Sequence, residues 1–422
     1  MRHQFRDSGA KAIIILDSLY PKLQKIQAET QIEHVIVTAV SDFLTGEMTL
    51  IDADVTPLLT ALEIGQACDY MPSPANQDDL ALLQYTGGTT GVSKGAQLTH
   101  NNLLTNAWQS GERLAGHCKA GQETFICPLP LYHIYAFTLN MVLFASQGNL
   151  NVLIPNPRDL DAFVDAIKAY TMTGFAGLNT LFVGLCQHRE FKKLDFSQLS
   201  LTLSGGTALT DAAAKIWREV TGCTISEGYG LSETSPVVTL NTPGQEQIGT
   251  VGLPLSGTEV QLWDENDQAV AQGQIGQVVV RGPQVMKGYW NLAAETAQVL
   301  TENGFFKTGD IGLEQTDGMI KIVDRLKDMI NVSGFNVYPN EVEEALVSHP
   351  AVLEAAVIGE PDEHSGERVH AFITLQQDVD EQAIIEHCKE QLTGYKLPKK
   401  ITIIDSLPKS AVGKILRREL RN

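Results

Sequence analysis

The stretch Thr86–Gly95 reads TGGTTGVSKG and directly follows the apolar run Leu80–Tyr85. It contains four glycines, three threonines and one lysine, Lys94. Glycines let a backbone turn tightly and present successive N–H groups to phosphate oxygens, and the hydroxyls and the ammonium group add further donors. The pattern predicts a phosphate-binding loop, entered from a strand at Ala81–Tyr85 and followed by a helix at Asn101–Gly111. The alternative is an ordinary hairpin turn rich in glycine and threonine.

Two common phosphate motifs do not fit this stretch. The Walker loop needs Gly-Lys followed directly by Ser or Thr, whereas Lys94 follows Ser93 and precedes Gly95. The dinucleotide fingerprint needs its glycines at a different spacing. The sequence therefore predicts a phosphate-binding loop of another kind.

Short aliphatic runs alternate with helical patterns along the chain and predict βαβ units with a mainly parallel sheet. The expected strands are Ala12–Leu16, Val35–Val37, Leu150–Ile154 and Leu199–Leu203, and the expected helices are Pro21–Glu29, Leu160–Ala169 and Asp211–Thr221. Short β-runs between turn residues predict a small antiparallel or barrel-like unit over Gly249–Arg281. Beyond Asp324–Lys327, which resembles a hinge, a block of about 95 residues has the alternation of a separate α+β domain. Its expected elements are helices Pro339–Ser348 and Glu381–Leu392 and strands Val352–Ile358, Val369–Leu375 and Ile401–Ile404.

Composition excludes several classes of protein. The 422 residues are 43% apolar and 19% charged, as in an ordinary globular protein large enough for two or more domains. A net charge of −19 argues against non-specific nucleic-acid binding, because a polyanion would be repelled. The six cysteines form no C-x-x-C pair, which indicates neither a zinc site nor a disulfide framework and fits a reducing cytosol. We therefore expect a cytoplasmic protein.

The segment Thr124–Pro157 contains no Asp, Glu, Lys or Arg. Its prolines and amide side chains interrupt it, so it offers no unbroken apolar helix of about 20 residues for crossing a membrane. We interpret it as buried core with part of a greasy ligand channel. Peripheral contact with the inner membrane stays open, as does the oligomeric state.

Four further motifs accompany the opening stretch in order along the chain. They are EGYGLSETSP (Glu227–Pro236), FKTGDIG (Phe306–Gly312), DRLKDMINVSGFNVYPNEVE (Asp324–Glu343) and LPKSAVGKILRREL (Leu407–Leu420). Together they resemble the adenylate-forming enzymes, which include acyl-CoA synthetases, luciferases and peptide-synthetase adenylation domains. Within that superfamily, LQYTGGTTG, PLYHIYAFTLN, NTLF, QLTGYKLPK and GKILRREL are most similar to the bacterial long-chain fatty-acid–CoA ligases.

The resemblance implies an α/β fold with a large N-terminal domain of layered, mostly parallel sheets with helices, plus a small β-barrel-like unit. A small, mobile α+β C-terminal domain follows. The implied boundaries are residues 1–324, a hinge at 325–327, and residues 328–422. Family members carry a further segment ahead of the position of Met1, so we expect the fold without its first part. An incomplete sheet would leave an exposed edge and apolar face, and we expect lower stability than in a version extended upstream.

The implied reaction explains which groups the site needs. A carboxylate is a poor acylating agent, but its attack on the α-phosphate of ATP gives an acyl-adenylate and pyrophosphate, and a thiol can then displace AMP. Two anions must be held together, which requires cations, N–H donors and Mg²⁺. We therefore expect ATP, Mg²⁺, coenzyme A and a long-chain fatty acid as cofactor and substrates.

Two residues are predicted to be catalytic. Glu233 lies in a loop rich in glycine and hydroxyl groups, where a carboxylate can hold Mg²⁺; otherwise it is an exposed loop glutamate. The resemblance implies Thr86 as the second metal contact. It also implies that Lys414 stabilises charge between the carboxylate and the α-phosphate. The neighbouring Lys409, Arg417 and Arg418 are interpreted as solvated, or as orienting the loop.

The remaining predicted site residues rest on the resemblance. Asp310 and Arg325 would bind ribose or phosphate, although an Asp after Gly is more often a turn residue. Lys327 is the expected hinge position, and Ser333 and Gly334 would admit the pantetheine arm after rotation. The full nucleotide-binding and coenzyme-binding set is Thr86, Gly87, Gly88, Thr89, Thr90, Gly91, Lys94, Gly205, Gly206, Gly228, Tyr229, Gly230, Ser232, Asp310, Arg325, Lys327, Ser333 and Gly334.

The resemblance implies that His133, Tyr135 and Phe137 line the acyl pocket. A histidine beside aromatic residues is more often a hydrogen-bonded core residue than a catalyst, and a substrate carboxylate is already ionised at pH 7. The resemblance thus implies a long-chain fatty-acid–CoA ligase. The alternatives are an acyl-AMP ligase feeding a carrier protein, or a truncated inactive fragment that binds nucleotide.

Overall fold

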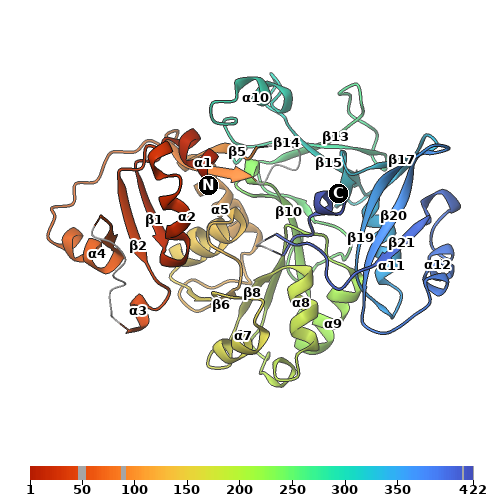
Figure 1. The fold of residues 1–422 in the computed structure, drawn as a ribbon, viewed down its shortest axis with the longest axis horizontal. Coiled ribbons are helices and arrows are strands. Elements are labelled where there is room, and N and C mark those ends of the chain that lie inside the picture. The colour runs from red at the N-terminus through yellow and green to blue at the C-terminus, as the bar shows by residue number, and fades with distance from the viewer. Residues whose placement is uncertain (46–53, 87–91, 411–412, 422) are drawn as a thin grey trace. The chain divides into compact units, whose positions relative to one another are not determined.

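The computed structural model describes residues 1–45, 54–86, 92–410 and 413–421 (Figure 1). The chain forms two compact units: Met1–His100 with Met286–Ala297, and Asn101–Val285 with Gln298–Asn422. The expected domain boundaries around residues 324 and 328 stay predictions.

The first unit holds a three-stranded parallel sheet, whose order is β1-β2-β3. Its strands are β1 (Ala12–Leu16), β2 (His34–Thr38) and β3 (Thr56–Pro57), and its helices are α1 (Arg2–Ser8), α2 (Tyr20–Gln24), α3 (Asp42–Thr45) and α4 (Leu58–Gln66). Both strands expected here are confirmed. The expected helix Pro21–Glu29 is shorter, because a separate 3₁₀ turn forms at Gln27–Glu29. Leu23 and Val37 are fully buried in the core of this sheet, whereas Ile14 on the alternate side of β1 is exposed.

A β-hairpin carries the opening stretch of the sequence. β4 (Leu80–Thr86) pairs antiparallel with β5 (Lys94–Thr99), and Thr86 lies opposite Lys94. The predicted strand is confirmed, but a second strand intervenes before α5 (His100–Arg113). The loop residues Gly87, Gly88, Thr89, Thr90 and Gly91 lie outside the described part of the chain. The strands on either side of these loop residues form a hairpin, which is the arrangement that the alternative expected. Phosphate binding by the loop stays a prediction.

The second unit is built on a seven-stranded sheet of order β12-β11-β10-β9-β8-β6-β7. Its strands are β6 (Thr124–Cys127), β7 (Leu150–Leu153), β8 (Gly174–Gly177), β9 (Leu201–Ser204), β10 (Ile225–Gly230), β11 (Val237–Leu240) and β12 (Leu253–Pro254). The five strands from β7 to β10 in this order pair in parallel, which confirms the expectation, and β11 and β12 are antiparallel.

Three helices lie along this sheet (Figure 1), and aromatic side chains contribute to the core that they share with it. They are α7 (Leu160–Ile167), α8 (Asn179–Gln187) and α9 (Asp211–Thr221), and the last matches its prediction residue for residue. Trp217 on α9 packs against Phe175 on β8 and Phe182 on α8, with ring centroids 5.1 and 4.8 Å away.

The uncharged segment forms β6, α6 (Ile134–Ala136), a π-helix at Phe137–Phe144, and β7. Phe144 stacks on Phe125 of β6 at 3.6 Å between centroids, and both are buried. Within the described residues, no helix is long and apolar enough to span a membrane. The interpretation of this segment as core is confirmed.

Two further sheets complete the second unit. The antiparallel alternative is confirmed for the first, whose order is β13-β14-β15-β16: β13 (Glu259–Trp263), β14 (Ile275–Arg281), β15 (Phe306–Glu314) and β16 (Ile320–Arg325). α10 (Ala293–Val299) lies between β14 and β15 in sequence. The last sheet contains β17 (Ile330–Val332), β18 (Phe335–Val337), β19 (Val352–Asp362), β20 (Gly366–Leu375) and β21 (Lys400–Ile403). α11 (Pro339–Val347) and α12 (Glu381–Lys389) share its core, which confirms the predicted α+β alternation.

Candidate active site

An ion pair at the end of the antiparallel sheet forms the centre of the candidate site. Asp310 on β15 lies directly opposite Arg325 on β16, and Arg325 Nε is 3.1 Å from Asp310 Oδ1. The Tyr229 hydroxyl, at the end of β10, donates to the other carboxylate oxygen at 2.7 Å. Burial, followed by the Asp310 charge, raises the pKa of Tyr229 well above its usual value. Three residues predicted from three separate motifs therefore meet at one carboxylate.

Glycines bring the neighbouring backbones into contact. A Cβ on Gly230 would lie 1.9 Å from the carbonyl oxygen of Pro236, and a Cβ on Gly228 would lie 3.1 Å from that of Thr239. No larger residue fits Gly230 without moving backbone. Gly206 has a φ of +84°, which also favours glycine. These positions explain physically why the GYG and SGG motifs carry glycine.

Buried hydroxyls without a partner lie near these glycines. Within the described residues, Tyr135 Oη, Ser204 Oγ and Thr207 Oγ1 are buried and make no hydrogen bond. A Cβ on Gly205 would lie 3.6 Å from the Tyr135 ring. Because a buried hydroxyl normally finds a partner, these atoms fit a polar ligand at the end of β9. A nucleotide offers such groups.

Glu227, two residues before Tyr229, belongs to the same region and was missed by the sequence reasoning. It is buried, and its Oε1 accepts the Leu209 N–H at 3.0 Å. Burial raises its pKa to about 8. An acid beside the GYG glycines is visible in the sequence, but its burial depends on how the loop before α9 folds over it.

Lys414 interacts electrostatically with Asp310, Arg325 and Lys327. Burial lowers its pKa to about 8, and the positive charges of Arg325 and Lys327 add to this effect while Asp310 opposes it. Lys327 is affected similarly: burial and Arg325 lower its pKa to about 8. The structure thus brings Lys414, Asp310, Arg325 and Lys327 within electrostatic range of one another, and their roles stay predictions.

The predicted acyl segment lies within electrostatic range of Lys414. Burial lowers the pKa of His133, and the charge of Lys414 lowers it further. His133 Nδ1 accepts the Tyr135 N–H at 3.3 Å and caps α6, which agrees with a structural role. Phe137 begins the π-helix. Lys414 therefore lies within electrostatic reach of both the ribose-binding candidates and the acyl-pocket candidates.

Ser333 and Gly334 form the tip of the hairpin between β17 and β18. Both residues have a left-handed backbone conformation, with φ of +54° for Ser333 and +87° for Gly334. They are exposed, and a Cβ on Gly334 would meet nothing within 4 Å. A role in admitting the pantetheine arm stays a prediction.

The metal prediction rests on donor chemistry. Glu233 is buried in a 3₁₀ turn between Ser232 and Thr234, and a carboxylate beside hydroxyl groups is a suitable ligand for Mg²⁺. Thr86 ends β4 in the first unit, and Lys94 Nζ lies 5.1 Å from the centre of the Tyr289 ring. Among the described residues, no cluster of three or more His, Cys, Asp or Glu could hold a metal by itself. A shared role of Thr86 and Glu233 stays a prediction.

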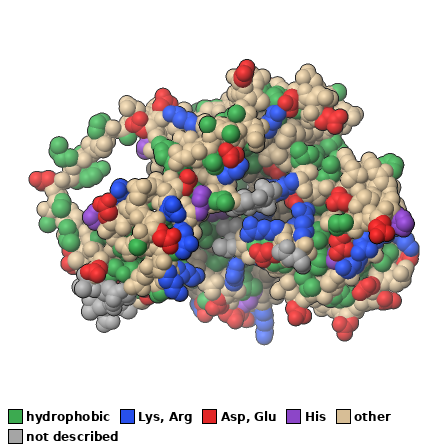
Figure 2. All heavy atoms as spheres, turned by 45° about the horizontal axis from the view of Figure 1, so that its top comes forward, with side chains coloured by type: hydrophobic (Ala, Val, Ile, Leu, Met, Phe, Trp, Pro, Cys, Tyr) green, Lys and Arg blue, Asp and Glu red, His purple; other side chains and the backbone are tan. Residues whose placement is uncertain are grey.

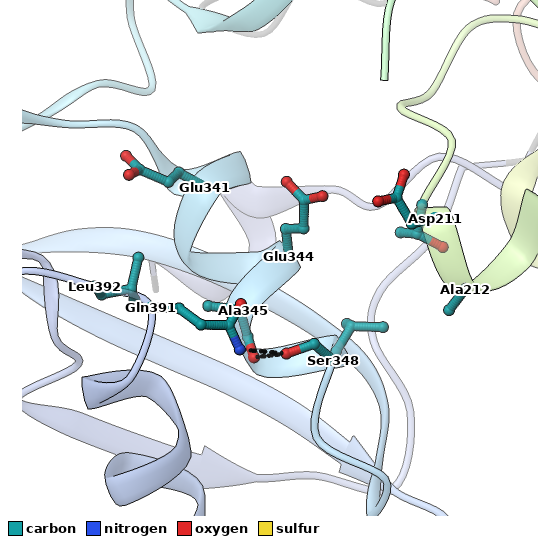
Figure 3. A pocket seen from close by; sticks show the side chains of 10 residues that line it. Asp211, Ala212, Glu341, Glu344, Ala345, Ser348, Gln391 and Leu392 are labelled. Carbon is teal, nitrogen blue, oxygen red and sulfur yellow. Dashed lines mark hydrogen bonds between the residues drawn. The ribbon is translucent and has the colours of Figure 1, made fainter. Parts of the chain in front are cut away.

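A separate pocket of about 260 Å³ lies between the beginning of α9 and α11. Figure 3 shows the side chains of Asp211 and Glu344 on opposite walls of this pocket. The Gln391 side-chain amide donates a hydrogen bond to the Ser348 hydroxyl at 2.9 Å. None of the predicted site residues lines this pocket. It is therefore distinct from the candidate active site.

Comparisons with known proteins agree with this geometry. Residues 1–290 match the AMP-binding enzyme family, and residues 341–414 match the AMP-binding enzyme C-terminal domain. A long-chain-fatty-acid–CoA ligase of Yersinia pestis is 44% identical over 440 residues, which cover 100% of this chain and 78% of the relative.

Two solved structures are similar over the whole chain. The anthranilate CoA ligase AuaEII in complex with anthranoyl-AMP has a TM-score of 0.90 at 28% identity, with 100% of this chain and 79% of that chain covered. ATP-bound MatB from Rhodopseudomonas palustris has a TM-score of 0.87 at 29% identity, with 100% and 80% covered.

Proposed function

The chain belongs to the AMP-binding enzyme family, and from this premise we propose that it is a long-chain fatty-acid–CoA ligase. The reaction has two steps. A carboxylate oxygen of the fatty acid attacks the α-phosphorus of ATP. The phosphoanhydride bond between the α- and β-phosphates breaks, and pyrophosphate leaves. The thiol of coenzyme A then loses its proton and attacks the acyl carbon, and AMP leaves as the thioester forms.

The position of Lys414 is the observation that carries this proposal. Its half-buried side chain lies within electrostatic range of the Asp310–Arg325 pair and of His133. A positive charge there can lower the repulsion between a carboxylate and the α-phosphate in the first step. Asp310, held by Tyr229 and Arg325, would accept hydrogen bonds from the ribose hydroxyls.

Glu233 and Thr86 would hold Mg²⁺. When bound, the ion supplies neutralisation of phosphate charge. The residues of this chain then have two tasks: Gly205 and Gly206 let the nucleotide approach the backbone closely, and Tyr135 and Phe137 line the acyl pocket. Ser333 and Gly334 are assigned to the thioester step.

We also propose peripheral contact with the inner membrane, where a poorly soluble fatty acid is collected. Apolar side chains are exposed in the second unit at Trp108, Met141 and Leu153. Figure 2 shows hydrophobic, acidic and basic side chains interspersed on one face. Sedimentation with vesicles of zwitterionic phospholipid tests this contact at a salt concentration that screens the net charge of −19, and a protein that stays in the supernatant contradicts it.

The main test is an assay with palmitate, Mg·ATP and coenzyme A that measures AMP, palmitoyl-AMP and palmitoyl-CoA. We expect palmitoyl-CoA and AMP in equal amounts. Accumulation of palmitoyl-AMP without thioester would indicate an acyl-AMP ligase. The absence of both products, with ATP still bound, would indicate an inactive nucleotide-binding fragment.

A further inference from the structure

We propose that Arg417 is a positioning residue that fixes Lys414 for acyl-adenylate formation by joining the C-terminal run of the chain to the end of β16. This inference rests on the proposed function, because it assumes that Lys414 acts in the first step. Arg417 lies three residues after Lys414. It touches neither the nucleotide-binding candidates nor the acyl-pocket candidates among the contacts of the described residues.

The Arg417 guanidinium uses all three of its nitrogens. Nε and one terminal nitrogen bind the two carboxylate oxygens of Glu343 at 3.0 and 2.8 Å, and that same terminal nitrogen donates to Asn340 at 2.7 Å. The other terminal nitrogen lies 3.5 Å from both Asp324 and Asp328. Such a planar, bidentate arrangement fixes orientation as well as distance, which a lysine could do only in part.

Burial separates this cluster from ordinary surface pairs. The side chain of Arg417 is 16% exposed, and that of Asp324 is 1% exposed. Removal of one partner of a buried charge group leaves the others unpaired in a medium where charge is costly. Burial raises the pKa of Asp324 to about 6 although Arg417 lowers it, so Asp324 depends on this cation to stay ionised.

Asp324 connects the cluster to the active site. Its two oxygens accept the N–H groups of Arg325 and Asn340, each at 2.7 Å. Arg325 is the residue that pairs with Asp310. Arg417 therefore joins the beginning of α11 to the strand end that carries the ribose-binding pair.

The backbone between Arg417 and Lys414 is also fixed. The Leu416 N–H donates to Pro408 O at 2.8 Å, and the Ser410 N–H donates to Lys414 O at 2.8 Å. Lys409 Nζ pairs with Glu354 at 2.5 Å at the other side of this turn. Because the turn is closed by its own hydrogen bonds, an anchor at Arg417 sets where the Lys414 side chain begins.

The test compares Arg417→Gln with Arg417→Lys and with Arg418→Gln, a matched loss of charge at the exposed neighbour. We expect Arg417→Gln to lower kcat of palmitoyl-AMP formation by roughly tenfold to a hundredfold, the scale for misplacing a reacting group by about 1 Å. The reaction of preformed palmitoyl-AMP with coenzyme A should fall much less, because that step does not use the Lys414 charge. Arg417→Lys should recover part of the loss, and Arg418→Gln, at an exposed side chain, should lower palmitoyl-AMP formation much less than Arg417→Gln.

Equal losses in both steps, or no loss relative to Arg418→Gln, would overturn the inference. If Arg417→Gln fails to fold, Asp324→Asn provides the decision, because it removes the charge contact with little change of shape and should give the same split between steps. A parent protein that forms no palmitoyl-AMP would instead contradict the proposed function. The two failures are thus distinguishable.

Discussion

The two sides of the candidate site are held in place by different kinds of interaction. The end of β10 at Gly228–Gly230 is fixed by backbone contact, since a Cβ on Gly230 would overlap Pro236. The turn that carries Lys414 is fixed by charge, through Arg417 and the Lys409–Glu354 pair. Backbone contact responds to side-chain volume, and charge responds to pH and salt. One half of the site is thus held rigidly by its backbone, whereas the position of the other half depends on the charges around it.

The largest effect is expected for Lys414→Ala. Loss of a charge contact in the transition state should lower palmitoyl-AMP formation by at least about a hundredfold. The reaction of preformed palmitoyl-AMP with coenzyme A should fall much less. Equal losses in the two steps, measured by rapid quench, would remove Lys414 from the first step.

Gly230→Ala is the corresponding change in the backbone-fixed half. The new Cβ would meet the Pro236 carbonyl at 1.9 Å, so the end of β10 must move away from β11 and displace Tyr229. We expect a lower melting temperature and a loss of palmitoyl-AMP formation of roughly a hundredfold, the scale for a displaced site. Gly65→Ala on α4 is the control, because nothing lies within 4 Å of its Cβ and alanine favours helix. A Gly230→Ala protein with unchanged melting temperature and activity would mean that the end of β10 is not rigid.

The charge-fixed half should be sensitive to pH. With a pKa lowered to about 8, Lys414 is charged below that pH and neutral above it. The kcat/KM for ATP should therefore fall about tenfold per pH unit above this value, since it reports groups of the free enzyme.

Lys327 and Lys414 both have pKa values lowered to about 8, and Lys327→Gln shows which of the two causes the decline in kcat/KM. Removal of the Lys327 charge should move the decline toward higher pH, because that charge lowers the pKa of Lys414. If the decline disappears in this variant, Lys327 rather than Lys414 is the titrating group.

The smallest effect is expected for Arg158→Gln. Arg158 donates to the Ser410 carbonyl at 3.2 Å from an exposed position, so it supports the Lys414 turn from outside. Loss of one exposed hydrogen bond is worth about 1 kcal/mol or less, and palmitoyl-AMP formation should fall by no more than a few-fold. A loss as large as that of Arg417→Gln would show that the turn is held mainly from this side.

The sequence predicted most elements of the fold because their patterns are local. α9 has a polar beginning, helical spacing and a glycine after its end, so its limits could be read directly. β5 was missed because Lys94–Thr99 reads KGAQLT, which has little strand character of its own. It forms a strand because it pairs with β4 along its length, a case of tertiary context overriding propensity.

The candidate site was predicted in part. Motifs identified Asp310, Arg325 and Lys414 as site residues, but only the strand pairing shows that Asp310 and Arg325 face each other. The interpretation of Arg417 as solvated is wrong, whereas the alternative that it orients the loop agrees with its burial. A basic tail in a sequence does not reveal that three acids from other segments surround one of its arginines.

The pairing of Asp310 with Arg325 has a consequence for how the gene can change in length. Successive side chains in a strand point to opposite faces, so one codon inserted within Gly312–Glu314 or Ile320–Val323 would turn one partner away from the other. The turn Gln315–Met319 closes on itself through Gln315 and Met319, outside that pairing. Insertions and deletions among homologous genes should therefore accumulate at this turn and be absent from the two strands beside it.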